Sequence, residues 1–189
     1  MPKHIEGILE AMAEDMDGVA ETPESNHLLQ VIKYGGMLTT VQDNVYWTLL
    51  TRILFVSCHS RTDLKIALPF LPTQVRNPDE EKYKNLARKI QYIKGMRGME
   101  LILEAESMDA IWWWIHAAYG VHLGLKGHSV GMMLFGKSAA DSKSSNRRIN
   151  LRISTESEII EVDNHMPGIL WALRFLGEQC FSVNENNVY

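Results

Sequence analysis

The run AIWWWIHAA, residues 110–118, carries the strongest signal for the fold of this chain. Aromatic and β-branched residues fill its centre and neither glycine nor proline interrupts it, which is the pattern of a β-strand. Alternate side chains of a strand point to opposite faces, so Trp112 and Trp114 share one face and Trp113 takes the other. Aromatic rows can also stack on the bases of single-stranded nucleic acid. On a central strand, however, we expect the tryptophans to pack in a core.

Segments on both sides of this run continue the pattern of a sheet. Three segments show the alternation of apolar and polar residues, or the short apolar clusters, that are typical of strands. We therefore predict further strands at residues 99–104, 131–135 and 138–148. Residues 187–189 begin another extended segment.

A long helix is predicted between the last two of these segments. Ser154 or Thr155 can cap its free backbone donors, and the helix runs to about Gln179 with a kink at Pro167. Strands followed by a helix and one more extended segment indicate a mixed sheet covered by a helix, in the α+β or α/β class.

In the first hundred residues the apolar side chains recur with the period of an α-helix instead. Apolar residues from 45 to 58 repeat like a buried helix face, and a second helix is expected after Ser60. A third has Asn77 as its cap, Pro78 at its first position and Gly95 as its stop. Residues 5–12 form a short helix before a polar linker with little to bury. The expected domains are an acidic leader and linker (1–42), a helical segment (43–98) and a sheet domain (99–189).

Composition excludes several classes of protein. The chain has 189 residues, of which 46% are hydrophobic, and this rules out intrinsic disorder. No apolar run approaches the roughly 20 residues that cross a bilayer, and the first residues lack a secretory signal, so we expect a soluble intracellular protein without a membrane partner. Cys58 and Cys180 form neither a disulfide framework nor a CxxC pair, and we expect both to be reduced core thiols.

Charge is distributed unevenly along the chain. Residues 1–25 contain seven acidic residues and one lysine, whereas the predicted helix at 82–97 contains six basic residues and no acidic one. Such a helix is either a surface that follows a phosphate backbone or an ordinary solvated face. A smaller basic group lies at 147–152. The candidate nucleic-acid-binding residues are Lys82, Lys84, Arg88, Lys89, Arg147, Arg148 and Arg152.

Five short motifs occur in a recognisable order. They are HSRTDL at 59–64, YIKGM at 92–96, KGHSVG at 126–131, SKSS at 142–145 and ISTESEI at 153–159. In the same order they resemble TRPDI, RYLKGT, KSHTGG, W-x-S-K-K/S and SSTEAEY of the pol polyprotein of copia-type LTR retrotransposons. Thr62 replaces the proline of the first motif. The chain thus resembles the tail of a reverse transcriptase followed by its ribonuclease H domain.

This resemblance implies both a fold and a chemistry. It makes residues 43–98 a helical connection segment of the reverse transcriptase and residues 99–189 the first part of a ribonuclease H-like domain. That domain is a five-stranded mixed sheet with helices on its faces, and it cuts the RNA strand of an RNA/DNA hybrid. Its mechanism uses two divalent metal ions, normally magnesium, which are held by four carboxylates.

The carboxylates that the resemblance requires are mostly missing. His116 stands where the first strand should carry aspartate, and an imidazole is a poor magnesium ligand. Glu158 matches the second carboxylate. The third belongs to a Y-x-D-N segment that would begin at the last residues, 187–189, and no Y-x-D-D element of a polymerase is present. We therefore expect a truncated, catalytically inactive pol fragment with no metal and no cofactor, in which Glu158 is a surface acid.

Two other functions remain open at this point. One is a residual magnesium-dependent hybrid nuclease that uses Glu158 with improvised ligands such as Asp109 or Asp163. The other is a repurposed, non-enzymatic module that binds RNA/DNA hybrid weakly. His116, His122 and His128 recur every six residues, a spacing that fits no typical zinc motif, and we expect His128 to have a structural role before the next strand.

The resemblance also predicts how the chain associates. In the ribonuclease H topology the fourth strand lies parallel beside the first. Because the sequence stops at Tyr189, we expect one side of the tryptophan strand to be unpaired. An open apolar edge favours pairing with another chain, so a homo-oligomer is expected.

Overall fold

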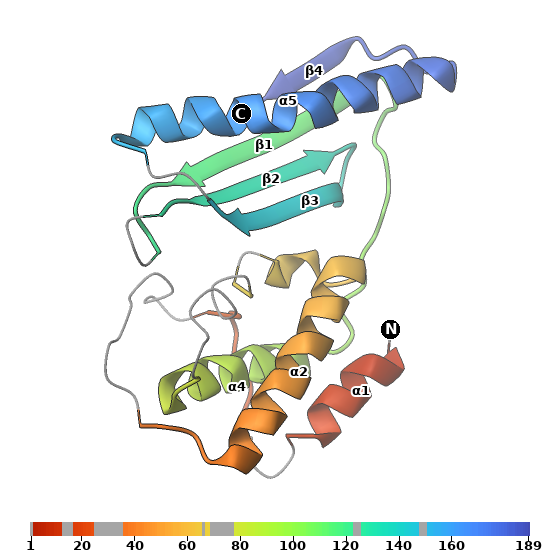
Figure 1. The fold of residues 1–189 in the computed structure, drawn as a ribbon. Coiled ribbons are helices and arrows are strands. Elements are labelled where there is room, and N and C mark those ends of the chain that lie inside the picture. The colour runs from red at the N-terminus through yellow and green to blue at the C-terminus, as the bar shows by residue number, and fades with distance from the viewer. Residues whose placement is uncertain are drawn as a thin grey trace. The chain divides into compact units, whose positions relative to one another are not determined.

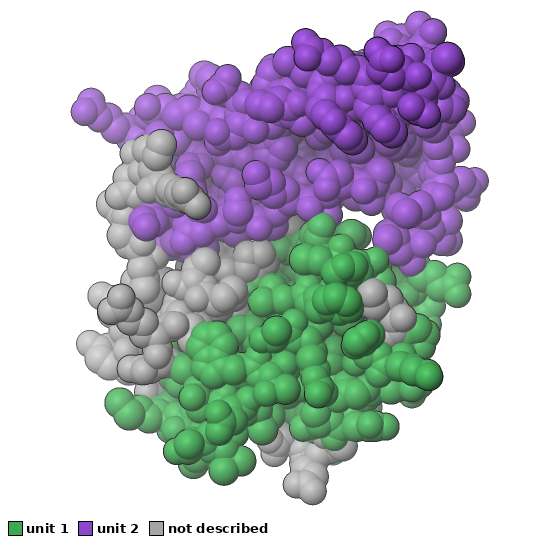
Figure 2. Space-filling model, turned by 45° about the vertical axis from the view of Figure 1, so that its right-hand side comes forward, with its two compact units in different colours: residues 1–100 green, residues 101–189 purple. Residues whose placement is uncertain are grey.

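The computed structural model describes residues 2–12, 17–24, 36–65, 67–68, 78–122, 126–147 and 151–189. The chain divides into two compact units, unit 1 (Met1–Glu100) and unit 2 (Leu101–Tyr189), which are green and purple in Figure 2. Each unit buries a hydrophobic cluster of its own. No helix within the described ranges is long and apolar enough to span a bilayer.

Unit 1 is helical. It contains α1 (Pro2–Glu10), α2 (Thr40–His59), the 3-10 turn η2 (Thr62–Leu64) and α4 (Glu80–Gly95), all labelled or traceable in Figure 1. Side chains from all three α-helices, among them Ile8, Ile53 and Ile90, are fully buried in one core. The helix predicted at the start of the chain is confirmed. It packs on α2 and α4 as part of this core, and so it is not a separate leader.

The helices of unit 1 begin at their capping residues. The Thr39 hydroxyl accepts a hydrogen bond from the Gln42 amide at 3.3 Å, and the Gln42 side chain accepts from the Thr39 amide at 3.1 Å, which forms a capping box. The prediction that Asn77 caps α4 is wrong. Asp79 is the cap, because its carboxylate accepts from the Lys82 amide at 2.9 Å.

Two other predictions for unit 1 need correction. The helix expected after Ser60 begins only as η2, and its expected residues 66 and 70–71 lie outside the described ranges. The Cys58 thiol is exposed and not in the core, because it lies on the outer side of α2. Cys180, just after the long helix of unit 2, is exposed as well.

Unit 2 is a four-stranded mixed sheet with one long helix. Its elements are β1 (Ala110–Ala118), β2 (His128–Leu134), β3 (Ala139–Asn146), α5 (Ser154–Glu178) and β4 (Glu185–Val188). The strand order is β3-β2-β1-β4; β1–β2 and β2–β3 are antiparallel, and β1–β4 is parallel (Figure 1). The predicted α+β class, with a mixed sheet under a long helix, is confirmed.

The helix α5 covers one face of the sheet along β1 (Figure 1). Ile111 and Trp113 of β1 pack against Ile169, Ala172 and Leu176 of α5, so the odd-numbered residues of β1 face the helix. Pro167 lies within α5, which continues through it. The prediction of a Ser154 or Thr155 cap is wrong: Ile153 holds the cap position, and its side chain makes no capping hydrogen bond.

Two predictions about the sheet are wrong. Residues 99–104 are not a strand, and only an isolated bridge between Ala105 and Gly136 follows them. The expected open edge of β1 is also largely paired, because β4 lies beside Ala110–Trp113. Tyr189 extends this pairing: its amide donates to the Trp113 carbonyl at 2.8 Å, and its carbonyl accepts from the Ile115 amide at 2.9 Å. Residues 185–189 therefore cover most of this edge of β1, and β3 and β4 are the outer strands of the described sheet.

Candidate functional site

The structure places His116, at the position of the first family carboxylate, and Glu158, at that of the second, on different sides of the sheet. His116 pairs with Val130 on β2, whereas its neighbour Ala117 pairs with Ser129. The Ser129 hydroxyl bonds to Glu161 on α5, so Ala117 and Ser129 share the face that the helix covers. His116 therefore points to the opposite face, and Glu158, an exposed residue of α5, lies on the helix side.

The geometry of a two-metal site is also lacking in the described part of the chain. No three side chains from histidine, cysteine, aspartate and glutamate gather there in a group that could hold a metal ion. This holds for Glu158 and for Asp109 and Asp163, which were considered as improvised ligands. Asp109 instead contacts the Ser107 hydroxyl at the start of β1.

The polar centre of unit 2 lies around Glu161, one turn beyond Glu158 on α5. Glu161 is only 3% exposed and forms an ion pair with Arg147 at 3.1 Å. Ser129 donates to the same carboxylate, and the Arg147 guanidinium also donates to the Ser157 carbonyl at 2.9 Å. We call Glu161, Arg147, Ser129 and His165 the buried polar cluster.

His165 completes this cluster from the next turn of α5. Its Nδ1 lies 2.9 Å from the Glu161 carbonyl oxygen and 3.1 Å from Oε1 of the Glu161 carboxylate. Its ring also lies directly over Gly131, where an added Cβ would be 2.0 Å from Nε2. The position of the ring therefore depends both on the carboxylate and on the missing side chain at residue 131.

Charge stabilises the ionised form of Glu161. Burial by itself raises the pKa of this carboxyl, but hydrogen bonds from His165, Ser129 and Arg147, with the charge of His165, lower the pKa to about 2. The same contact with Glu161 raises the pKa of His165 above its ordinary value. At neutral pH the cluster is thus a charge-paired structural network in which Glu161 is ionised, while Nη1 of Arg147 and Nε2 of His165 are buried without a hydrogen-bond partner among the described residues.

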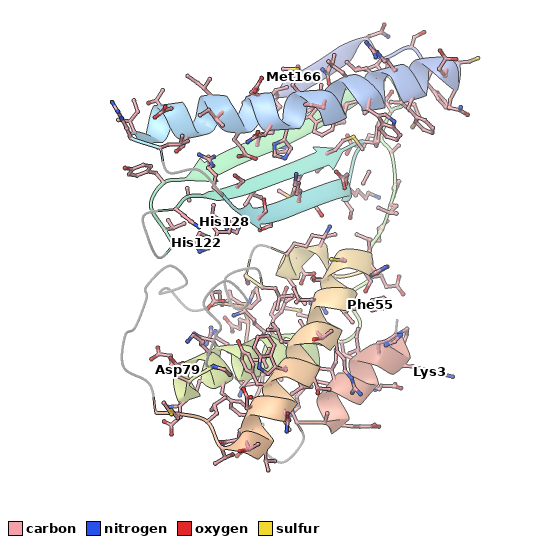
Figure 3. All side chains as sticks on the ribbon, in the orientation of Figure 1. Lys3, Phe55, Asp79, His122, His128 and Met166 are labelled. Atoms are coloured by element: carbon pink, nitrogen blue, oxygen red, sulfur yellow. The ribbon has the colours of Figure 1, made fainter. Side chains whose placement is uncertain are left out.

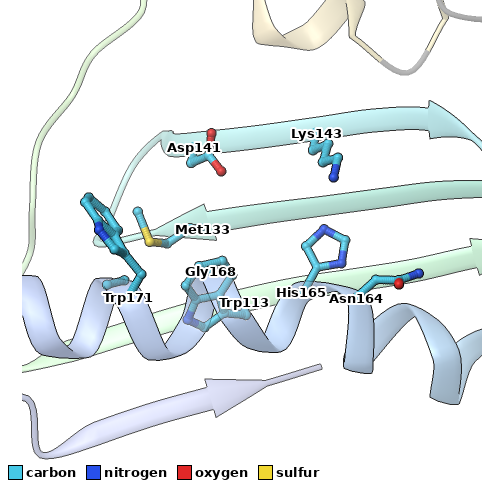
Figure 4. A pocket seen from close by; sticks show the side chains of 9 residues that line it. Trp113, Met133, Asp141, Lys143, Asn164, His165, Gly168 and Trp171 are labelled. Carbon is cyan, nitrogen blue, oxygen red and sulfur yellow. The ribbon is translucent and has the colours of Figure 1, made fainter.

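A groove lies beside this cluster, between α5 and β3 (Figure 4). It has a volume of about 270 Å³, with Trp113, Met133 and Ala172 among its apolar lining residues. Its polar residues are Asp141 and Lys143 from β3 and Asn164 and His165 from α5. An apolar floor with a few polar groups is the usual composition of a small-molecule site, although about 300–1,000 Å³ is the usual size.

A second polar group lies at the start of β2, on the face of the sheet opposite to Ser129 and the buried polar cluster. His122 and His128 are 5% and 2% exposed, and Nε2 of His122 lies 2.9 Å from Nδ1 of His128 (Figure 3). Nε2 of His128 lies 2.8 Å from the Ser144 hydroxyl on β3. Burial and the neighbouring His122 lower the pKa of His128 to about 4, and burial with the charge of Lys126 lowers the pKa of His122. This chain of hydrogen bonds ties the start of β2 to β3.

Because these histidines have lowered pKa values, we expect unit 2 to become less stable as the pH falls. The folded pKa of His128 is about 4 against an ordinary value of 6.5, so the unfolded chain binds more protons between those two pH values. The free energy of unfolding of unit 2 should fall by about 2 kcal/mol between pH 6.5 and 4.5. Urea unfolding followed by tryptophan fluorescence measures this, since four of the five tryptophans belong to unit 2.

A matched variant isolates the contribution of His128. His128→Asn has no titrating group at this position, so its stability should be much flatter over the same pH range. Unfolded His165 and Glu161 titrate at the two edges of this window, near 6.5 and 4.5, and their contributions of about 0.4 kcal/mol each have opposite signs, so together they should not mask the effect. Stability that is constant or rises from pH 6.5 to 4.5 in the unmodified chain would contradict the prediction.

Most of the basic residues predicted to bind nucleic acid have other roles in the structure. Lys89 is 1% exposed and forms an ion pair with Glu24, because the acidic segment 17–24 packs on α4. Lys82 pairs with Asp79 at 3.1 Å, and Arg88 donates to the Thr22 hydroxyl at 3.1 Å. Lys89 is therefore not available to phosphates, contrary to the prediction, whereas Lys82 and Arg88 are partly exposed and have a partner on the surface.

Of the remaining basic residues that the structure describes, one is buried and two are exposed. Arg147 is buried with Glu161, so its assignment to a nucleic-acid surface is wrong. Arg148 lies outside the described ranges. The side chains of Lys84 and Arg152 are exposed, and they are the two predicted positions where the structure leaves a cation on the surface.

Two sequence motifs of unit 1 meet at Arg61. The guanidinium is buried, bonds to the Asp63 carboxylate at 2.7 Å and donates to the Met96 carbonyl at 3.2 Å. It also lies 5.3 Å from the centre of the Tyr92 ring. The HSRTDL and YIKGM segments are therefore joined through one arginine.

The buried polar cluster was not predicted from the sequence. Residues 157, 161, 165, 169, 172 and 176 are the inner face of α5, a spacing that places Glu161 and His165 toward the sheet. This period was visible in the sequence, whereas the partner Arg147 is brought in only by the packing of unit 2.

Comparisons with known proteins give no relative for this arrangement. No protein-family model matches the chain, and no curated protein or solved structure matches it.

Proposed function

We propose that this chain is part of a copia-type pol polyprotein, in which unit 2 is a ribonuclease H-like unit that does not cleave RNA/DNA hybrid. The proposal begins from the five motifs in the sequence. The order of β3-β2-β1-β4, with β4 parallel to β1, supports it because the ribonuclease H topology places its fourth strand parallel beside its first.

Contacts between the motifs give further support. His128 of the KGHSVG segment bonds to Ser144 of the SKSS segment, and Ser129 bonds to Glu161 just after the ISTESEI segment. In unit 1, Arg61 contacts Tyr92 and Met96. Residues far apart in the sequence thus interact where the motifs lie, which is expected if the motifs preserve one ancestral packing in each unit.

The main evidence for the proposed lack of cleavage is the position of His116. An imidazole cannot replace a carboxylate that bridges two magnesium ions. Its face of the sheet is also opposite to the face that α5 covers, so Glu158 does not complement it. The loss of cleavage therefore has two causes, the type of residue and the direction of its side chain.

A substitution that restores the family carboxylate at residue 116 should not restore cleavage. Neither the unmodified chain nor His116→Asp should cleave a labelled RNA/DNA hybrid with magnesium or manganese, because a carboxylate at residue 116 still lies away from Glu158. An active ribonuclease H on the same hybrid is the positive control, and product is measured on a denaturing gel. Hybrid cleavage that disappears in Glu158→Ala would contradict the proposal, and cleavage by His116→Asp would contradict the assignment of faces.

A further inference from the structure

Three aromatic side chains gather on the face of the sheet that α5 leaves open. Trp112 and Trp114 are two residues apart on β1, so both point away from the helix. The Trp114 ring stacks on Tyr189, with 4.9 Å between the ring centres and 22° between the planes. Trp114 is 50% exposed and Tyr189 is 58% exposed, so these rings are not part of the core.

The rings line a cavity with a single charged residue. Its volume is about 380 Å³, and its lining consists of Trp112, Trp114, Tyr189, Leu134, Gly136 and Glu106. No ion pair of Glu106 occurs within the described ranges, and its carboxylate is exposed. The cavity thus presents aromatic surfaces and one negative charge, without a cation.

The backbone holds Glu106 at the edge of this cavity. The Glu106 amide donates to the Phe135 carbonyl at 2.9 Å, next to the bridge between Ala105 and Gly136. A Cβ on Gly136 would lie 2.5 Å from the Glu104 carbonyl oxygen and 2.8 Å from the Glu106 amide nitrogen. Glycine at residue 136 therefore permits the close approach that brings the acid to the tryptophans.

These features select one kind of ligand. The face of an aromatic ring carries partial negative charge and attracts a cation, most strongly for tryptophan. A carboxylate beside the rings adds to this attraction and disfavours anions. A quaternary ammonium group suits such a site because its methyl groups contact the rings and it gives up little hydration. From this geometry we propose that Trp112, Trp114, Tyr189 and Glu106 bind a small quaternary ammonium compound of the size of choline.

This site is independent of the proposed function. All of its residues belong to unit 2, and none of them is His116, Glu158 or a member of the buried polar cluster. A chain that fails to cleave hybrid could still bind the ammonium compound, and the reverse also holds. The two proposals can therefore fail separately.

The test compares a cation with its uncharged isostere. Choline chloride and 3,3-dimethylbutan-1-ol have the same shape, and only choline carries a charge. Each is titrated into the full chain at constant ionic strength, and binding is followed by the indole N–H signals in ¹H–¹⁵N NMR spectra. We expect choline to bind at least about tenfold more tightly than the alcohol.

Variants locate the binding. Trp114→Ala should weaken choline binding at least about tenfold, and Glu106→Gln should weaken it about three- to tenfold. Trp171→Ala is the matched control, because Trp171 is an aromatic residue of unit 2 that is 63% exposed and lies on α5, outside this cavity. It should leave choline affinity unchanged. If Trp114→Ala does not fold, Glu106→Gln and Tyr189→Leu provide the same test at exposed positions.

Three results would overturn the proposal. The first is equal affinity for choline and the alcohol, which would mean that the charge is not recognised. The second is a choline affinity that Glu106→Gln and Tyr189→Leu leave unchanged. The third is the absence of a saturable shift of any indole signal below about 50 mM choline.

Discussion

Replacing Glu161 with alanine should lower the free energy of unfolding of unit 2 by about 3–5 kcal/mol at pH 7. The carboxylate is 3% exposed and contacts Arg147, Ser129 and His165. Its removal leaves the buried Arg147 guanidinium without a counter-ion in a region that water does not reach. Small domains have a free energy of unfolding of only about 5–15 kcal/mol, so this substitution should remove a large part of the stability of unit 2. Urea unfolding followed by tryptophan fluorescence measures the change.

Glu158→Ala is the matched control on the same helix. Glu158 is exposed, so its substitution should change the free energy of unfolding by no more than about 0.5 kcal/mol. The two variants together show whether Glu158 or Glu161 is the carboxylate of α5 that stabilises unit 2. Equal destabilisation by both substitutions would show that the buried polar cluster does not stabilise unit 2 as inferred.

Gly131→Ala should destabilise unit 2 by about 3 kcal/mol, the upper part of the usual range for overpacking. The new Cβ would lie 2.0 Å from Nε2, 2.5 Å from Cδ2 and 2.8 Å from Cε1 of His165. The ring cannot move away without losing its contacts with Glu161. Alanine is otherwise no worse than glycine in a strand, so the sign of the effect identifies the clash. The midpoint of urea unfolding reports it.

A double-mutant cycle tests the cause of this effect. In a His165→Ala background the ring is absent, so Gly131→Ala should then cost less than about 1 kcal/mol. Gly168→Ala on α5 is a control, since nothing lies within 4 Å of its added Cβ, and it should be neutral or stabilising by up to about 1 kcal/mol. If Gly131→Ala costs the same with and without His165, the clash is not the cause.

Several elements could be predicted because their signals are local. The strand at 110–118 has the bounds that its apolar run indicates, and the strands at β2 and β3 and the helix α5 begin within a few residues of their expected positions. Strand and helix periods depend on neighbours in the sequence, so a single sequence contains them. The parallel pairing of residues 185–188 with β1 agrees with the expected topology but closes the edge that was expected to be open.

The wrong predictions share a different origin. Residues 99–104 alternate like a strand, but a strand needs a partner along its length, and only Ala105 meets one. The cap of α4 shifted from Asn77 to Asp79 because both residue types can cap and only geometry selects between them. Lys89 looked like a surface cation until Glu24, 65 residues earlier, was found beside it.

For this protein, the sequence by itself determined the order of the elements, the α+β class and the odd and even faces of β1, because these follow from the period of apolar residues along a local stretch of chain. Only the tertiary structure decided which polar side chains function together. It placed Glu161 with Arg147, separated His116 from Glu158, and set Glu106 beside Trp112, Trp114 and Tyr189. The physical reason is that burial and charge pairing depend on distances between segments remote in sequence, and these distances are set only when the sheet and its helix pack.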